Sequence, residues 1–527
     1  MKRLFTITAV SLLTLLVINT LTPEVTYARP GGGHSYNNSS SNSSSNSSSS
    51  SSSGSSSSSN SSSSEDNSSY WDDVELNDDS TTEGYSDSKP ASPLATIFGF
   101  VFMFAVLGLN GLAYHYYEKY KAGKKLFSKN KKDFEKQSLK IEKAISKLKQ
   151  SDPNFSRTLF LDFAASIFTK YHALQGSSNF KNLSPYLTTI EIAKHNSRKI
   201  KKEISEIVIG NIDLKTVYPG LTRITVDISA NYTLTQKGKT TRYDVVERWS
   251  FKRKPNLLSP TPEKMRELSC PNCGASTGFT DTGTCESCGT LVKNGEMQWY
   301  VSSRNKLHQQ VFETSGLAHY EQEKGTRLST IYHPDNENQL KYFADNHNIN
   351  TDEWLSKFDN KVVHEYFTKI YDAWSVNKLD KVRHLLSDRL FDSYMFWIAA
   401  YKAEGLTNKL DELKIKKIKL AKIELDKFYE SVTVRIFASC KDYVADKQGK
   451  VVGGSNRKSR KFSEYWTFIR KTGVETDTYD YGTCPNCGAV ADKIGQSGIC
   501  EYCDSKISNG DFSWVLAVIT QDEVYKG

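Results

Sequence analysis

Eight of the nine cysteines fall into two clusters of the same design. Each cluster has two Cys-x2-Cys pairs, separated by 11 residues in the first cluster and 12 in the second. Such a pair directs two thiolates at one ion across a tight turn, and two pairs complete the tetrahedral four-sulfur shell that Zn²⁺ accepts. We therefore predict two metal sites with the following ligands: Cys270, Cys273, Cys285 and Cys288; Cys484, Cys487, Cys500 and Cys503.

Both sites should be structural, since four protein ligands leave no coordination position open for catalysis. Zinc is expected; iron in the same sulfur shell and disulfide bonds are the alternatives. Gly274, Gly289 and Gly488 follow the second cysteine of three pairs and Asp504 follows that of the fourth. These residue types accept the left-handed backbone conformation. The ninth cysteine, Cys440, lies on the apolar face of a predicted strand and is interpreted as a core residue.

Two stretches after residue 151 share one plan, a helix followed by strands. Apolar residues recur at helical spacing over 163–171 and over 362–370. Alternating apolar residues then predict strands over 224–234 and 432–440. Helices followed by antiparallel strands predict an α+β fold. The later strands carry tryptophans that we interpret as core or pocket wall: Trp249, Trp299, Trp466 and Trp514.

The N-terminal part contains two apolar segments with a polar tract between them. Residues 1–28 have the pattern of an export signal peptide, with an uncleaved membrane helix as the alternative. Residues 29–93 are rich in Ser and Asn and then acidic, which predicts a disordered spacer. Residues 94–113 form an uncharged apolar run beside tyrosines, which predicts a transmembrane helix rather than a buried soluble helix.

The segment 114–150 is predicted to be a basic juxtamembrane helix. It has twelve lysines against four acidic residues, a balance of +8 in a chain of net charge +9. Since the lysine-rich flank of a span stays inside, we predict a single-pass protein of the cell (inner) membrane, with the spacer outside and the later domains cytoplasmic. The lysines from Lys119 to Lys149 are expected to face anionic lipid; a solvated helix face is the alternative.

The C-terminal stretch resembles the bacterial branch of the Tim-44-like family, named for the translocase of inner membrane subunit 44. The resemblance covers 351–520 and rests on five motifs: Tyr371-Asp-Ala-Trp374, the helix from Tyr394 to Gly405 with Leu406 after it, Val432 to Arg435, Phe462 to Phe468, and Cys484 to Trp514.

Residues 151–302 match the family less well, through 152–155 and 247–249. The resemblance implies two cone-like, nuclear-transport-factor-like domains in which helices cover a curved antiparallel sheet. Each domain would carry a zinc ribbon, over 268–292 in the first and 482–507 in the second, and a linker over 303–350 would join the two domains.

The family implies a membrane-bound adaptor without a catalytic residue, because its mitochondrial members tether an import motor or a ribosome to the inner membrane. We expect a scaffold for protein translocation or membrane-protein assembly, with translocation or ribosome components as partners. Binding of ribosome or nucleic acid through the ribbons is the alternative. It is supported by a basic run over 194–202, but the ribbons have only Lys293, Lys493 and Lys506 to contact phosphate.

An enzyme is not expected from this sequence. No His is paired with Asp or Ser at motif spacing, no glycine-rich phosphate loop is present, and neither metal site has an open position. His364 and His384 are interpreted as surface or satisfied core histidines.

Overall fold

The computed structural model describes residues 136–527, with gaps at 176, 197–201, 267, 269, 276–277, 281, 315–316, 318–325, 327, 479–481, 491–493 and 523. The predicted signal peptide (1–28), spacer (29–93), transmembrane helix (94–113) and most of the basic segment lie outside these residues. The end of the basic segment is described and is helical over 136–151. Among the described residues, none of the helices has the length and apolarity needed to cross a bilayer.

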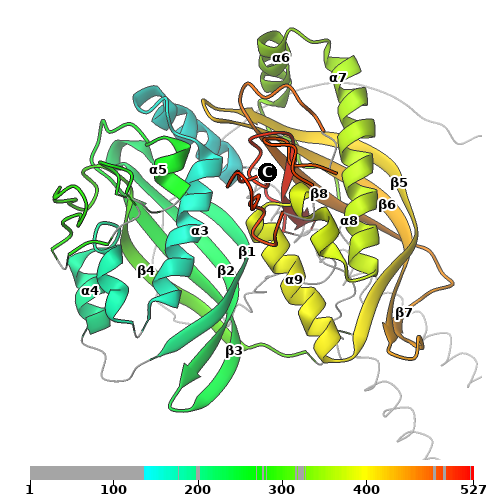
Figure 1. Cartoon of the computed structure of the whole chain (residues 1–527). Helices are drawn as coiled ribbons and strands as arrows, with labels where there is room; N and C mark the ends of the chain where they lie inside the picture. The colour runs from blue at the N-terminus through cyan, green and yellow to red at the C-terminus, as the bar shows by residue number, and fades with distance from the viewer. Residues whose placement is uncertain are drawn as a thin grey trace, which may run out of the picture. The chain divides into compact units, whose positions relative to one another are not determined.

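The first domain is built on a four-stranded antiparallel sheet whose strands follow chain order, β1-β2-β3-β4. Helix α3 packs on one face of this sheet (Figure 1). Along β2, residues at every second position from Ile224 to Tyr232 are at most 1% exposed, as their alternation predicted. The elements are α3 (Arg157–Ala173), η1 (Ser178–Leu183), α4 (Thr189–Asn196), β1 (Glu203–Tyr218), η2 (Pro219–Leu221), β2 (Arg223–Gln236), β3 (Lys239–Lys252), α5 (Pro262–Arg266) and β4 (Tyr300–Val311).

The second domain has a five-stranded antiparallel sheet in the order β5-β6-β8-β9, with the short β7 beside β6. Helices α8 and α9 pack into its core (Figure 1). Its elements are α6 (Asn336–His347), α7 (Thr351–Phe358), the π-helical η4 (Asp359–Val363), α8 (His364–Ser375), η5 (Leu379–Leu385), α9 (Asp388–Ala403), β5 (Leu406–Leu425), β6 (Tyr429–Asp446), β7 (Val451–Gly454), β8 (Arg460–Lys471) and β9 (Val515–Gln521).

The two sheets bend at the same place. In the first strand of each sheet a glutamate with positive φ interrupts the register: Glu206 (φ 49°) in β1 and Glu412 (φ 53°) in β5. An extra residue of this kind forms a bulge, which bends a strand and increases its twist. The mixed architecture of helices on a bent antiparallel sheet therefore agrees with the expected α+β class.

The last strand of each sheet lies later in the chain than the apolar pattern indicated. Trp299 and Trp514 precede β4 and β9, and β4 continues to Val311, although the first domain was expected to end at residue 302. The expected linker over 303–350 thus contains most of β4 and also helix α6. Arg304 and Lys306 break the apolar alternation of β4, which is why the sequence pattern ended too early.

The tryptophans and the ninth cysteine lie in the two cores. Trp249, Trp299, Trp466 and Trp514 are all 0% exposed, which confirms their interpretation as core or pocket wall. Cys440 is also 0% exposed, as expected for a core residue.

Candidate metal centres and a polar cavity

Each predicted set of four cysteines is brought together. In both clusters the sulfur atoms all lie within 4.8 Å of one another. A tetrahedral site with metal–sulfur bonds of about 2.3 Å has sulfur–sulfur edges of roughly 3.8 Å, whereas a disulfide bond is roughly 2.05 Å long. Four of the sulfur pairs lie 3.7 to 3.9 Å apart: Cys270–Cys288 and Cys273–Cys285 at 3.9 Å, Cys484–Cys503 at 3.8 Å and Cys487–Cys500 at 3.7 Å. The donor sets therefore fit two metal ions and not four disulfide bonds.

All four Cys-x2-Cys turns have the same backbone. In each turn the residue after the second cysteine donates its N–H to the carbonyl of the first cysteine, at 2.8 to 3.0 Å. These residues adopt positive φ, as predicted: Gly274 (78°), Gly289 (67°), Gly488 (75°) and Asp504 (56°). The turn directs both thiols of a pair to the same point, so local sequence alone builds each half of the site.

The thiols within a cluster differ: burial raises the pKa of Cys270 to about 12, whereas hydrogen-bond donors bias at least one thiol of each cluster toward the thiolate. Hydrogen bonds from Thr290 first, and then from Asn272, lower the pKa of Cys288 to about 6. Ser505 first, and then Asn486, lower the pKa of Cys503 to about 6 in the same way. Because the thiolate is the metal-binding form of cysteine, this bias favours metal binding near neutral pH.

Each ribbon is anchored to the equivalent loop of its own domain, the loop that precedes α4 in the first domain and α9 in the second. In the first domain, the Asn294 amide donates to the carbonyls of Ser184, Pro185 and Leu187 at 2.8 to 3.0 Å. In the second domain, the Arg383 guanidinium donates to the carbonyls of Leu386, Gln496 and Ser497 at 2.6 to 3.2 Å. The ribbons are thus parts of their domains rather than free appendages.

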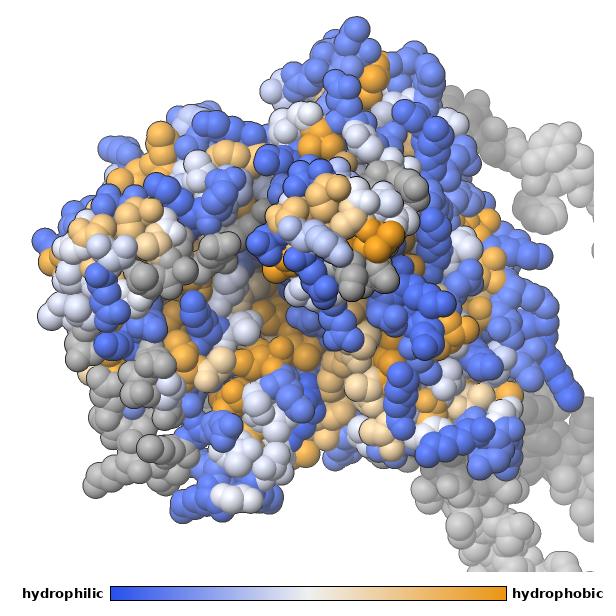
Figure 2. Space-filling model, viewed as in Figure 1, coloured by the Kyte–Doolittle hydropathy of each residue, from blue (hydrophilic) through white to orange (hydrophobic). Residues whose placement is uncertain are grey.

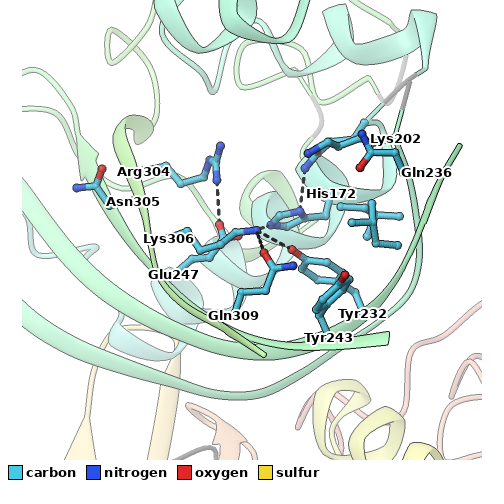
Figure 3. Close-up of a pocket in the computed structure, with 13 residues that line it drawn as sticks. His172, Lys202, Tyr232, Gln236, Tyr243, Glu247, Arg304, Asn305, Lys306 and Gln309 are labelled. Carbon is cyan, nitrogen blue, oxygen red and sulfur yellow. Dashed lines mark hydrogen bonds and ion pairs between the residues drawn. The ribbon is translucent and has the colours of Figure 1, made fainter. Parts of the chain in front are cut away.

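A cavity of about 520 Å³ lies in the first domain, between α3 and the sheet (Figure 3). Side chains from the helix, from the segment leading into β1 and from all four strands line it, and most of them are polar. The lining residues are His172, Gln175, Lys202, Ile204, Tyr232, Leu234, Gln236, Tyr243, Glu247, Arg304, Asn305, Lys306 and Gln309.

The centre of the cavity wall is Glu247, a carboxylate that is 0% exposed. Its Oε2 accepts hydrogen bonds from Trp249 Nε1 at 3.0 Å and from the Arg304 guanidinium at 3.2 Å. Burial raises the pKa of Glu247, but contacts with His172, Arg304 and Trp249 outweigh it and lower the pKa to about 2. Glu247 is therefore ionised at neutral pH and compensates the charge of Arg304.

His172 lies beside this carboxylate and is 1% exposed. Burial lowers its pKa, so the imidazole is neutral near pH 7. Its Nδ1 is 2.9 Å from the Gln175 amide nitrogen and accepts from it, which assigns the imidazole proton to Nε2. That Nε2 is 3.4 Å from Glu247 Oε1, and neither atom makes a hydrogen bond within the described residues.

Strand β4 supplies the positive charge of the cavity. Besides Glu247, Arg304 reaches the Tyr171 hydroxyl at 2.9 Å. Lys306 Nζ donates to the Tyr232 hydroxyl at 3.2 Å and to Gln309 Oε1 at 2.6 Å (Figure 3). With Lys202 on the opposite wall, three cations face the single carboxylate of Glu247, so the lining has a net positive charge.

The family resemblance implies a cavity between the helices and the sheet of each domain, but the sequence interpretation did not identify the residues that line it. His172 lies four residues after Phe168 on the buried face of α3, and Glu247 alternates with Trp249 and Phe251 on the inward face of β3. A His and a Glu at inward-facing positions were therefore the available signal. Of the two histidines that the sequence interpretation did consider, His364 is exposed, which agrees with a surface residue, and His384 is partly buried.

The family model of the Tim44-like domain matches residues 347–481. The match begins at the end of α6, contains α7 to α9 and β5 to β8, and stops before Cys484. The first domain and both ribbons lie outside it. No curated protein matches the chain.

Proposed function

We propose that this chain is a non-enzymatic, membrane-anchored scaffold for protein translocation or membrane-protein assembly. The observation that carries the proposal is the Tim44-like match over 347–481, because this family points to a translocation-related scaffold role. The apolar run 94–113 and the lysine-rich segment after it support a membrane anchor with cytoplasmic domains.

We further propose that the first domain is a divergent second copy of the Tim44-like domain. Four features support the duplication. Both sheets have their first strand bent at a glutamate bulge. Both have a ribbon before the last strand. Both have a parallel bridge from the anchoring loop to the start of the last strand, Leu187 with Val301 and Leu386 with Leu516. Both place a Glu two residues before a buried Trp, at 247 and 464.

We propose that each four-cysteine cluster holds a structural Zn²⁺ ion. The sulfur spacing and the closed set of four thiolates support this assignment. Elemental analysis of freshly purified full-length protein is expected to find two zinc ions per chain. Iron in place of zinc would overturn the metal identity, and protein without any metal would overturn the assignment of the sites.

Photo-crosslinking in native membranes tests the scaffold role. Lys402, at the end of α9, is exposed, so a crosslinking residue placed there can reach a partner. The buried Trp374 is the matched control, because its side chain cannot leave the core. Capture of translocation or membrane-insertion components from position 402, and not from 374, supports the scaffold. Capture of none of these components overturns it.

Exposed lysines on β5 favour a ribosome as a second candidate partner. β5 is an edge strand, and the side of the molecule where it lies in Figure 1 is largely hydrophilic in Figure 2. The exposed lysines are Lys409, Lys414, Lys416 and Lys417. Lysines on an edge strand also prevent sheets from pairing edge to edge, so this feature has a purely structural explanation as well.

Ribosome co-sedimentation at increasing salt separates these two explanations of the β5 lysines. Binding that falls steeply with salt, and that is weakened by changing the four lysines to Gln, supports ribosomal RNA as a partner. Binding that the four substitutions leave unchanged removes this candidate.

A further inference from the structure

The space for the cavity arises because small or polar residues replace large aromatic ones. On the packing helix, His172 and Gln175 occupy the positions that Tyr371 and Trp374 occupy in the second domain. In the second domain, Tyr371 is 0% exposed and Trp374 is 1% exposed, and the indole N–H donates to Asn408 at 2.8 Å. The shorter Gln175 leaves a cavity of about 520 Å³, which is within the range of small-molecule sites.

The charges on the last strand also differ between the two domains. In the first sheet Arg304 lies opposite Trp249 on the neighbouring strand. At the equivalent position of the second sheet, the apolar Ile519 lies opposite Trp466. Lys306 pairs with Glu247, where Gln521 pairs with Glu464. Arg304 is compensated by Glu247, but Lys306 and Lys202 add two further positive charges to the lining. An excess of positive charge in a partly closed pocket favours an anionic ligand.

The buried wall of the cavity has two polar atoms that face each other at 3.4 Å without forming a hydrogen bond of regular geometry. Glu247 Oε1 is an acceptor, and His172 Nε2 carries a proton because Nδ1 accepts from Gln175. Their residues are 0% and 1% exposed. A buried polar atom without a partner is costly. A ligand hydroxyl can donate to the carboxylate and accept from the imidazole N–H, so one such group satisfies both atoms.

We propose that the cavity of the first domain binds a small hydroxylated organic anion. Its carboxylate or phosphate contacts Lys306, with Lys202 on the facing wall, and its hydroxyl lies on the cavity side of the Glu247–His172 pair, where it bridges the two side chains. This ligand site lies outside the segment that matches the Tim44-like domain, so it does not depend on the proposed scaffold function.

Calorimetric titration of the full-length chain tests this site with matched ligand pairs. The probes are malate against succinate, which lacks the hydroxyl, and glycerol 3-phosphate against inorganic phosphate. At least one hydroxylated probe is expected to bind about tenfold more tightly than its partner, because the partner leaves the buried pair unsatisfied. Preference for malate over succinate would identify the ligand as a carboxylate, and preference for glycerol 3-phosphate over phosphate would identify it as a phosphate.

Two variants place the binding in the cavity. Lys306→Met should weaken binding of the preferred probe about tenfold by removing a charged contact, and Gln175→Trp should abolish it by filling the space. Gln521→Met is the matched control in the second domain and should bind like the unchanged chain. Unfolding midpoints of all three variants check that they fold.

Three outcomes overturn the proposal. One is that neither hydroxylated probe binds the unchanged chain. Another is that the hydroxylated probes bind no better than their partners. The third is that a folded Lys306→Met variant binds as tightly as the unchanged chain.

Discussion

Glu247 in the first domain and Glu464 in the second are both fully buried and both lie two residues before a buried tryptophan. In the second domain the Tyr371 hydroxyl donates to Glu464. In the first domain the Arg304 guanidinium and the Trp249 indole donate to Glu247, with His172 beside it. The two glutamates thus occupy the same position in their sheets but different surroundings. Glu464 lies in the closed aromatic core of the second domain, and Glu247 lies in the wall of the charged cavity of the first domain.

The metal sites do not show this difference. Both ribbons have the same turn hydrogen bonds and the same left-handed residue after each cysteine pair. Each is anchored to the equivalent loop of its own domain. The ribbon is therefore the part that the two domains share, and the interior beneath the first packing helix is the part in which they differ.

Removing one ligand from each ribbon is expected to have the largest effect. Cys285→Ser and Cys500→Ser should each reduce the metal content from two ions per chain to one and unfold the affected ribbon. Structural zinc contributes about 10 kcal/mol or more to the folding of such small sites. Elemental analysis and limited proteolysis measure the effect, with Cys440→Ser as a control that keeps both ions. Two ions retained in either ligand variant would contradict the equivalence of the ribbons.

Replacing Trp374, which fills the core of the second domain, should have the next largest effect on stability. Trp374→Gln removes a large buried ring and is expected to lower the free energy of unfolding by about 3 to 5 kcal/mol. The reverse change in the first domain, Gln175→Trp, fills existing space and should cost clearly less. Urea unfolding measures both variants. An equal cost would mean that the first interior has no room for an indole.

The two buried glutamates should respond differently to loss of charge. Glu247→Gln leaves the largely buried Arg304 with only the more distant carboxylate of Glu191, at 3.9 Å, and should cost about 2 to 3 kcal/mol. Glu464→Gln keeps an oxygen that can accept from the Tyr371 hydroxyl, so about 1 kcal/mol is expected. Urea unfolding at pH 7 gives both values. A cost for Glu247→Gln that is smaller than the cost for Glu464→Gln would refute the conclusion that Glu247 compensates the charge of Arg304.

The first domain should also lose stability as the pH falls. The native pKa values of His172 and Glu247 both lie below their ordinary values. Their stabilising contribution is therefore present at neutral pH. The contribution of His172 is lost below about pH 6.5, because the histidine is then protonated in the unfolded chain. The contribution of Glu247 is lost between about pH 4.5 and 2, as that carboxylate is protonated first in the unfolded chain and then in the native protein.

A His172→Gln variant isolates the histidine part of this pH dependence. Between pH 6.5 and 5, its free energy of unfolding should change less than that of the unchanged chain, by up to about 1.4 kcal/mol per pH unit. Urea unfolding at several pH values measures the difference. A matching Tyr371→Phe variant should keep the full dependence, because a tyrosine hydroxyl does not titrate in this range.

Helix capping should give the smallest difference between the two domains. Ser156 caps α3 by accepting from Leu159 N–H at 3.2 Å, and Asn350 caps α7 by accepting from Asp352 and Glu353 N–H groups at 3.0 and 3.1 Å. Replacement of either residue by Ala should cost about 1 kcal/mol. Thermal unfolding measures both. A cost near zero would show that the cap does not contribute to helix stability.

Local pattern was sufficient to predict several parts of this molecule. The cysteine spacing predicted both four-sulfur clusters, because each pair is organised by its own turn. Alternating apolar residues predicted β2 and β6, since the inward face of each strand packs into the core of its domain. The extent of β4 was missed, because its charged residues carry no apolar alternation.

By itself, the sequence determined the two four-cysteine clusters and the buried faces of the main strands, which depend on spacing within short segments. Only the tertiary structure decided that the first interior is a charged cavity and the second a packed core. Arg304 meets Glu247 from 57 residues away and Tyr171 from 133 residues away. Such contacts depend on strand register and helix packing, so no periodicity along the chain reveals them.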